Sequence, residues 1–215
     1  MNKTMKKKIL KVLALVACAV LLVVGSIAGT LAYMTSLTGT VTNTFTVGNV
    51  AITLDEAKVT AYGVKDGDTR VMTNAYKLIP SHNYVKDPTI HVTAGSEQCW
   101  LFVKVENGIS AIEAAGNTTI AAQMTANGWT QLEVDGVAVE NVYYHAVVDA
   151  RTEAKDVKVF EEFTIAGNAD VSGYVTTTNA DAVVNVTAYA VQADGFTSAE
   201  LAWESASTNW TQAQG

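Results

Sequence analysis

The chain has 215 residues, of which 49% are hydrophobic and 16% charged, so it can form one substantial core but is short for two full domains. Five of its 14 basic residues precede residue 32, which leaves nine against 21 acidic residues and a net charge of −12 in the rest. That remainder contains no basic patch, which argues against nucleic-acid binding.

The first 32 residues have the pattern of a secretory leader. Lysines come first, and an apolar run follows over residues 9–31, interrupted by a single lysine. Thr30 and Ala32 are small residues at the −3 and −1 positions of a cut, which predicts cleavage between Ala32 and Tyr33. The product would be secreted to the extracellular matrix or the cell surface. Its only contact with the membrane would be through the leader before cleavage.

Two alternatives to this cleavage stay open. The last part of the apolar run has roughly 20 residues, which is long enough to span a bilayer as a retained anchor. The tetrapeptide that ends at Cys18 also fits the lipoprotein pattern, in which that cysteine is acylated and becomes the N-terminus.

Beyond residue 44 the chain reads as β-structure. Short runs with alternating polar and apolar residues predict about nine or ten strands. The runs cover residues 45–54 (kinked at Gly48-Asn49), 57–64, 89–93, 98–106, 130–134, 142–148, 159–165, 173–178 and 183–192. A turn is expected at residues 65–68, and Asp135-Gly136 is a strong hairpin signal.

Two short helices interrupt this pattern. One is expected within residues 109–127, where Gly128 ends an apolar stripe. The other begins at a capping box formed by Thr197 and Glu200. The density of strands predicts an all-β fold, a jelly-roll-like antiparallel β-sandwich with one or two short helices.

No residue pattern indicates catalysis or a cofactor. The histidines at positions 82, 91 and 145 belong to no zinc motif, and Asp66-Gly67-Asp68 lacks the further ligands of a calcium loop. Cys99 lies in a strand-like run and is expected to be a buried, inert thiol. The sequence therefore does not support an enzyme, and we expect neither a metal nor a cofactor.

Several stretches, in order, resemble one family of exported proteins. They read GTLAYMT, TNTFTVGNVAITLDE, YKLIPSHNYVKDPTIHVTAGSEQCWLFVKVEN and VNVTAYAVQADGFTSAELAW. The chain resembles Gram-positive proteins whose leader is cut by a SipW-type signal peptidase, a family that includes the TasA biofilm matrix protein and the camelysins. The resemblance covers nearly the whole chain, and its most specific part is the leader junction with NTFTVGNV.

This resemblance implies a jelly-roll-like sandwich that self-associates into fibres after processing by the SipW-type peptidase. In such fibres the freed N-terminal segment of one subunit completes a sheet of the next. The domains would then be a signal peptide (1–32), an N-terminal extension (33–44), a β-sandwich (45–206) and a polar tail (207–215). Camelysins are described as surface metalloproteases, but this sequence has no zinc motif to carry that activity.

The extension itself suits strand donation. Residues 33–41 carry no charge and have high β-propensity, with Tyr33, Met34, Leu37 and Val41 as the apolar side chains. Such a segment promotes aggregation unless it pairs with a sheet edge. The alternative function is a monomeric cell-surface binding module or a camelysin-like surface protease.

Overall fold

The computed structural model describes residues 49–174 and 183–206, together with the backbone of residues 211–212. Contacts within the chain define two units, Met1–Thr46 and Val47–Gly215, and every described residue belongs to the second. The predicted leader, the cut between Ala32 and Tyr33, and the donor residues Met34, Leu37 and Val41 all lie outside the described ranges. Within those ranges, no helix is long and apolar enough to cross a membrane.

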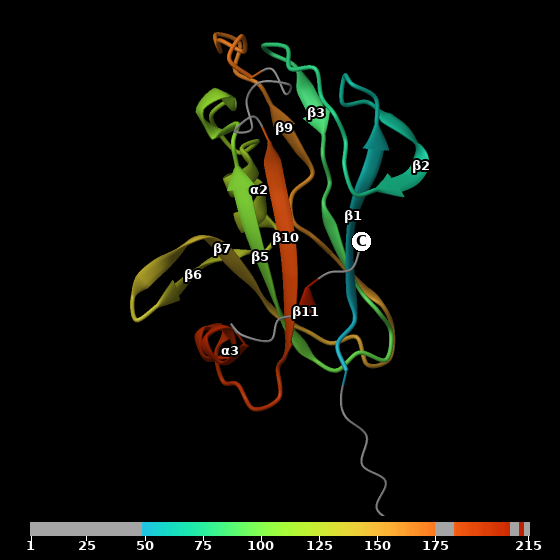
Figure 1. Ribbon diagram of the computed structural model, residues 1–215, viewed down its shortest axis with the longest axis vertical. Coiled ribbons are helices and arrows are strands. Elements are labelled where there is room, and N and C mark those ends of the chain that lie inside the picture. Colours follow the sequence, from blue (N-terminus) through green and yellow to red (C-terminus); the bar gives the residue numbers. More distant parts are fainter. Residues whose placement is uncertain (1–48, 175–182, 207–210, 213–215) are drawn as a thin grey trace, which may run out of the picture. The chain divides into compact units, whose positions relative to one another are not determined.

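The described chain is built from antiparallel strands, which confirms the predicted all-β class. One sheet has the order β2-β1-β4-β8, with β1 at Ile52–Val59, β2 at Lys65–Val71, β4 at Thr89–Val92 and β8 at Lys155–Lys158. A second sheet has the order β11-β10-β5-β7-β6 (Figure 1), with β5 at Cys99–Asn107, β6 at Thr130–Val134, β7 at Val137–Val148, β10 at Val184–Gln192 and β11 at Thr211–Gln212. A small third sheet pairs β3 (Asn83–Val85) with β9 (Glu162–Thr164).

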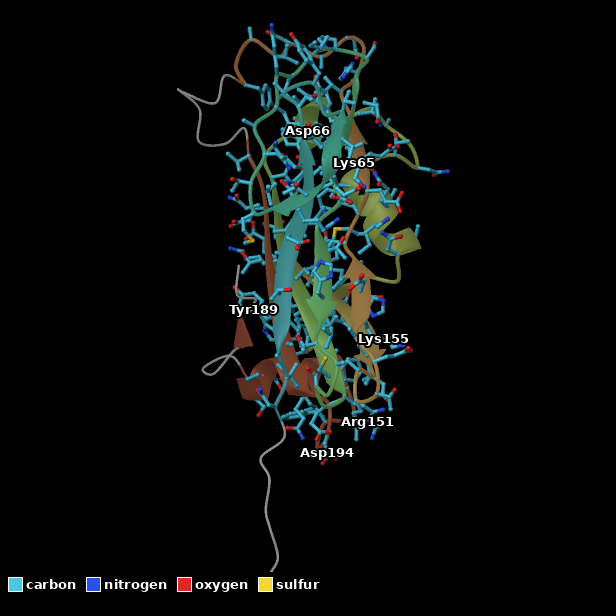
Figure 2. All side chains as sticks on the ribbon, turned by 90° about the vertical axis from the view of Figure 1, so that its right-hand side faces the viewer. Lys65, Asp66, Arg151, Lys155, Tyr189 and Asp194 are labelled. Carbon is cyan, nitrogen blue, oxygen red and sulfur yellow. The ribbon has the colours of Figure 1, made fainter. Side chains whose placement is uncertain are left out.

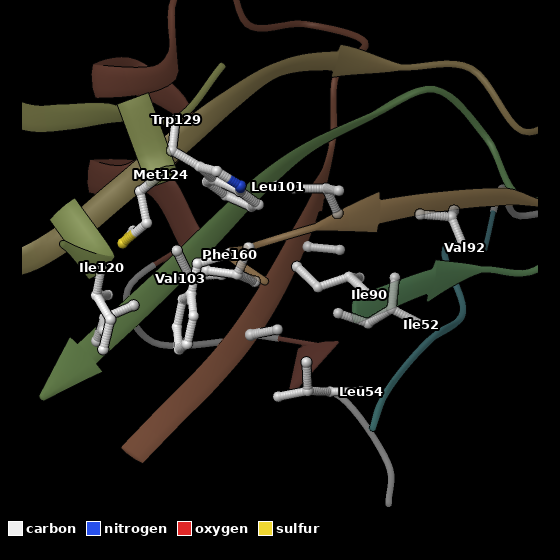
Figure 3. Close-up of a cluster of buried hydrophobic side chains, with 14 of the residues drawn as sticks. Ile52, Leu54, Ile90, Val92, Leu101, Val103, Ile120, Met124, Trp129 and Phe160 are labelled. Carbon is white, nitrogen blue, oxygen red and sulfur yellow. The ribbon is translucent and has the colours of Figure 1, made fainter. Parts of the chain in front are cut away.

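The two larger sheets share one hydrophobic core, as expected of a sandwich. Alternate residues of β1, β4 and β5 point into it, and side chains around the helix α2 (Ile120–Ala126) extend it (Figure 3). Its buried members include Ile52, Leu54, Ile90, Val92, Leu101, Val103, Ile120, Met124, Trp129 and Phe160.

The five-stranded sheet also buries part of its other face. Phe102 packs there with Leu132 and with Ala202 of the helix α3 (Ala199–Ala206). Both neighbours of Phe102 point into the main core, so residues 101–103 are all fully buried. A run of consecutive apolar residues in β5 is therefore explained by cover on both faces.

The structure corrects the predicted turn at residues 65–68. Those residues form the exposed start of β2 (Figure 2), and the chain reverses earlier, at residues 60–63. The Gly63 amide donates to the Thr60 carbonyl at 2.8 Å, and the Thr60 amide donates to the Val64 carbonyl at 2.9 Å. Gly63 has φ +70°, a left-handed conformation that glycine adopts without strain. The chain therefore turns at Gly63, and the strand predicted over 57–64 ends before this turn.

The helices are shorter than the sequence indicated. Within 109–127 only Ser110–Ile112 (a 3₁₀ turn, η1) and α2 are helical, because Gly116 takes φ +114° and Thr119 caps a new start by accepting from the Ala122 amide. At α3 the cap is Ser198 rather than Thr197: its hydroxyl accepts from the Leu201 amide at 3.3 Å.

Strand bounds also differ in places. The short strands β3 and β8 have too few residues to alternate visibly and were not predicted. The strand expected at 159–165 shrinks to β9, and β7 begins five residues before the predicted 142. Of the strand expected at 173–178, residues 173–174 are not in a strand and the rest lie outside the described ranges.

Candidate functional site

Two strands are each paired along only part of one edge. β1 pairs with β4 from Ile52 to Asp55 and with β2, on its other edge, only from Glu56 to Val59. β10 pairs with β5 along its whole length, but β11 reaches it only at residues 189–190. Among the described residues, no strand therefore covers the β2-side edge of β1 at 52–55 or the outer edge of β10 at 184–188.

A hollow of about 160 Å³ lies between these half-paired strands, and a second of about 260 Å³ adjoins it beside the start of β10. Both are lined by Asn74, Lys86, Val183 and Val184. The first extends to Leu54, Met72 and Val186, and the second to Tyr76, Leu78, Ile109 and Phe163. We call the two hollows together the edge groove. The lining of the second hollow is mostly apolar, whereas half of the residues that line the first are polar, among them Asp55, Thr73 and Asn185. Met72 is 53% exposed, so the groove opens to solvent.

A buried ion pair borders the groove. The Lys86 ammonium lies 2.6 Å from a Glu56 carboxylate oxygen, and the two side chains are only 12% and 4% exposed. The Asn74 amide donates to the other Glu56 oxygen at 2.9 Å. Because each charge has a close partner, the pair is neutral as a unit.

Asn74 also bonds with the backbone of β1. Its amide nitrogen donates to the Ala57 carbonyl at 2.9 Å, and its carbonyl oxygen accepts from the Val59 amide at 3.0 Å. These bonds fall where the register between β1 and β2 shifts, between Ala57 and Val59. The neighbouring Tyr76 hydroxyl donates to the Val85 carbonyl at 3.1 Å. Burial, with added repulsion from Glu56, raises the pKa of Tyr76, so this phenol stays neutral.

The face of the four-stranded sheet that points away from the core carries a charge network. Its links are a contact from Arg70 to Asp55, a 3.2 Å pair from Arg70 to Asp87, and two bonds of His91, to Asp55 at 2.9 Å and to Asp156 at 2.7 Å. The network therefore crosses all four strands. Since a neutral imidazole has one N–H, both carboxylates can accept from His91 only when its ring is protonated.

The pKa values in this network shift accordingly. Burial alone would lower the pKa of His91, but the hydrogen bonds to Asp55 and Asp156 outweigh it and raise that pKa. Burial alone would raise the pKa of Asp55, but Arg70 and His91 outweigh it and lower that pKa. The stability that His91 contributes is thus complete below about pH 6.5 and is lost as pH rises through its folded pKa. The contribution of Asp55 is present above about pH 4 and is lost as pH falls through its folded pKa.

The charge network links neighbouring strands of the sheet. The described residues contain no group of three or more His, Cys, Asp or Glu placed to hold a metal ion. The other two histidines make unrelated contacts: His82 donates to the Tyr62 carbonyl at 2.8 Å, and His145 packs against Trp129. Cys99 is fully buried, and burial raises its pKa to about 12, as expected for an inert thiol.

Sequence reasoning missed the polar residues of the groove. Asp55 and Glu56 are adjacent in β1 and point to opposite faces of the sheet, and the buried position of Glu56 was not predicted. A signal was present in the sequence: Ile52, Leu54 and Glu56 are spaced two residues apart in β1, so the glutamate lies on the same buried face as the two apolar residues. Its partner Lys86 is 30 residues away in a loop, and no local pattern marks it.

No protein-family model, no curated protein and no solved structure matches this chain.

Proposed function

We propose that this chain is an exported structural protein, a TasA-like subunit of biofilm matrix fibres with a jelly-roll-like sandwich. A SipW-type signal peptidase would release it by cutting between Ala32 and Tyr33. Subunits would then self-associate by strand donation, with residues 33–44 as the donor. In this role the protein is not an enzyme and needs no cofactor.

The observation that carries the proposal is the combination of an uncharged, strand-prone extension with a sandwich in which β1 and β10 are only half paired among the described residues. Open edges and strand-prone termini are liabilities in a monomer, because each presents unpaired backbone groups. Strand donation between subunits would pair the backbone groups of the open edge with those of the terminal segment. The acidic net charge of the remaining chain keeps unassembled subunits apart in solution, because like charges repel.

Electron microscopy of the secreted protein tests the proposal. The full chain is expressed with its leader in a Gram-positive host that has a SipW-type peptidase, and the secreted product is compared with Leu37→Asp/Val41→Asp. We expect filaments from the wild type and monomers from the double variant. The matched control is Val137→Asp, since Val137 is 68% exposed on the β6–β7 hairpin; it should leave filaments intact.

Wild-type protein that stays monomeric over a range of pH and concentration would refute the fibre proposal and favour a monomeric surface module. The intact mass of the secreted chain tests processing separately. A mass that begins at Tyr33 supports cleavage of the leader, whereas an acylated Cys18 would overturn it.

A further inference from the structure

We propose that the buried cluster of Lys86, Glu56 and Asn74 forms a covalent cross-link within the chain. The product is an isopeptide bond between Lys86 Nζ and Asn74 Cγ, made with loss of ammonia and with the Glu56 carboxyl as the proton carrier. The proposal rests on these three side chains and is independent of whether the chain forms fibres.

The three side chains come from different segments and meet at one carboxylate. Glu56 points from β1 into the core, Asn74 follows β2, and Lys86 directly follows β3. Lys86 Nζ lies 2.6 Å from one Glu56 oxygen, and Asn74 Nδ2 lies 2.9 Å from the other. Because both groups bond to the same carboxylate, the amine and the amide are held as neighbours, as an intramolecular reaction requires.

Backbone groups of β1 hold the Asn74 amide in one orientation. Its Oδ1 accepts from the Val59 amide at 3.0 Å, and its Nδ2 donates to the Ala57 carbonyl at 2.9 Å. Attack on Cγ places negative charge on Oδ1, and the Val59 N–H is positioned to stabilise that charge. The departing nitrogen, Nδ2, is the atom already bonded to Glu56.

The lysine becomes a nucleophile when it loses a proton. One ammonium proton passes from Lys86 Nζ to the Glu56 carboxylate across the 2.6 Å contact. Both side chains are largely buried, and a buried site penalises charged groups more than neutral ones. The transfer leaves a neutral amine, which is the form that attacks a carbonyl carbon.

The atoms of the reaction balance without a further reactant. A bond forms between Nζ and Cγ, and the bond between Cγ and Nδ2 breaks. Two protons leave Nζ, pass through the Glu56 carboxyl and join the departing NH₂ group, which leaves as ammonium. One hydrogen stays on the new amide nitrogen, and Glu56 is a carboxylate again. Asn74 and Lys86 line both hollows of the edge groove, which gives ammonium a path to solvent.

The link closes a ring of chain over residues 74–86 and fixes part of the lining of the edge groove. A cross-link restricts the unfolded chain, so linked molecules should unfold at a higher temperature than unlinked ones. The Lys86–Glu56 ion pair is the state that precedes the reaction. Stability measurements on that pair therefore apply to chains that have not yet reacted.

The test follows the link by mass spectrometry of the full-length chain, sampled at intervals after purification. Trypsin does not cut after an acylated lysine, so the linked chain gives peptide 71–77 joined to peptide 78–104. Unreacted chain gives 78–86 and 87–104 as separate peptides. Fragmentation should place the bond between the asparagine of the first peptide and the internal lysine of the second, and the linked fraction should rise with time.

The peptides are needed because the intact mass alone is ambiguous. The link removes one ammonia molecule, but Asn107-Gly108 and Asn127-Gly128 can lose ammonia by ring closure of the asparagine on its own backbone. A direct amide between Lys86 and Glu56 would remove water instead, so mass and fragmentation together identify the bond.

Glu56→Gln tests the proton carrier, because it keeps both reacting groups. It should slow formation of the link by about 100-fold or more. Lys104→Met is the matched control: it also breaks an ion pair, of 2.7 Å, but an exposed one, and it should link at the wild-type rate. Circular dichroism checks that each variant is folded.

The wild-type chain decides whether the link exists. Only separate peptides after several days at neutral pH would refute it, and so would a bond from Lys86 to any residue other than Asn74. Equal rates in folded Glu56→Gln and the wild type would refute the role of Glu56. Filament formation is a separate observation, so failure of the fibre proposal leaves this result unchanged.

Discussion

Replacement of Lys86 by methionine tests the buried pair at the edge groove. Lys86→Met keeps the length of the side chain but leaves the buried Glu56 carboxylate with only the Asn74 amide as its close partner. Removal of one partner of a buried ion pair costs about 3–5 kcal/mol. A domain of this kind has about 5–15 kcal/mol in total, so the loss is a large part of its stability.

The second arm removes both charges. In Lys86→Met/Glu56→Gln the buried carboxylate is gone, and a neutral amide can still bond with Asn74. We expect this double variant to recover much of the loss and to remain within about 1–3 kcal/mol of the wild type. Glu56→Gln alone completes the double-mutant cycle. The losses of the two single variants should sum to more than the loss in the double variant, as expected for residues in contact.

The assay is urea unfolding followed by tryptophan fluorescence, with free energies of unfolding from linear extrapolation. Lys104→Met is the control, because the Lys104–Glu106 pair has a similar distance of 2.7 Å but both side chains are more than 40% exposed. It should change the free energy of unfolding by less than about 1 kcal/mol. A Lys86→Met variant as stable as this control, or strict additivity in the cycle, would refute the reasoning.

Three further predictions follow from single sites. Gly63→Ala should be strongly destabilising, because a Cβ there lies within 2.8 Å of Tyr84 atoms and the residue has φ +70°. Gly67 has a similar φ of +74° but open space around it, so Gly67→Ala should cost only the backbone strain of about 1–2 kcal/mol. Equal midpoints of the two variants in thermal unfolding would contradict this. His91→Gln should lose most stability relative to the wild type near pH 5, and this loss should shrink by about 1 kcal/mol or less as pH rises above 6.5. Urea unfolding at each pH measures the free energies. A difference that does not depend on pH would contradict a protonated His91 ring. Cys99 should react with iodoacetamide only after unfolding, and labelling of the native protein, read by intact mass, would show that its pKa is not raised.

Local pattern was a good guide where a strand is long and lies in one register. The runs at 98–106, 130–134 and 183–192 are found as β5, β6 and β10 within about one residue, and Asp135-Gly136 forms the hairpin between β6 and β7. Alternation works there because one face of each strand is buried more than the other. It failed for β8, whose four residues take their place through pairing with β4.

What the sequence by itself determined is the class of fold, the inert character of Cys99 and a pattern at residues 1–44 that predicts export and donation. What only the tertiary structure decided is which strands of the described chain pair with one another and which side chains lie beside their edges. Asn74 and Lys86 bond with Glu56 from 18 and 30 residues away. Residues of β10, far along the chain, line the same hollow as residues of β1. Such meetings depend on how distant segments pack, and that packing leaves no period in the local sequence.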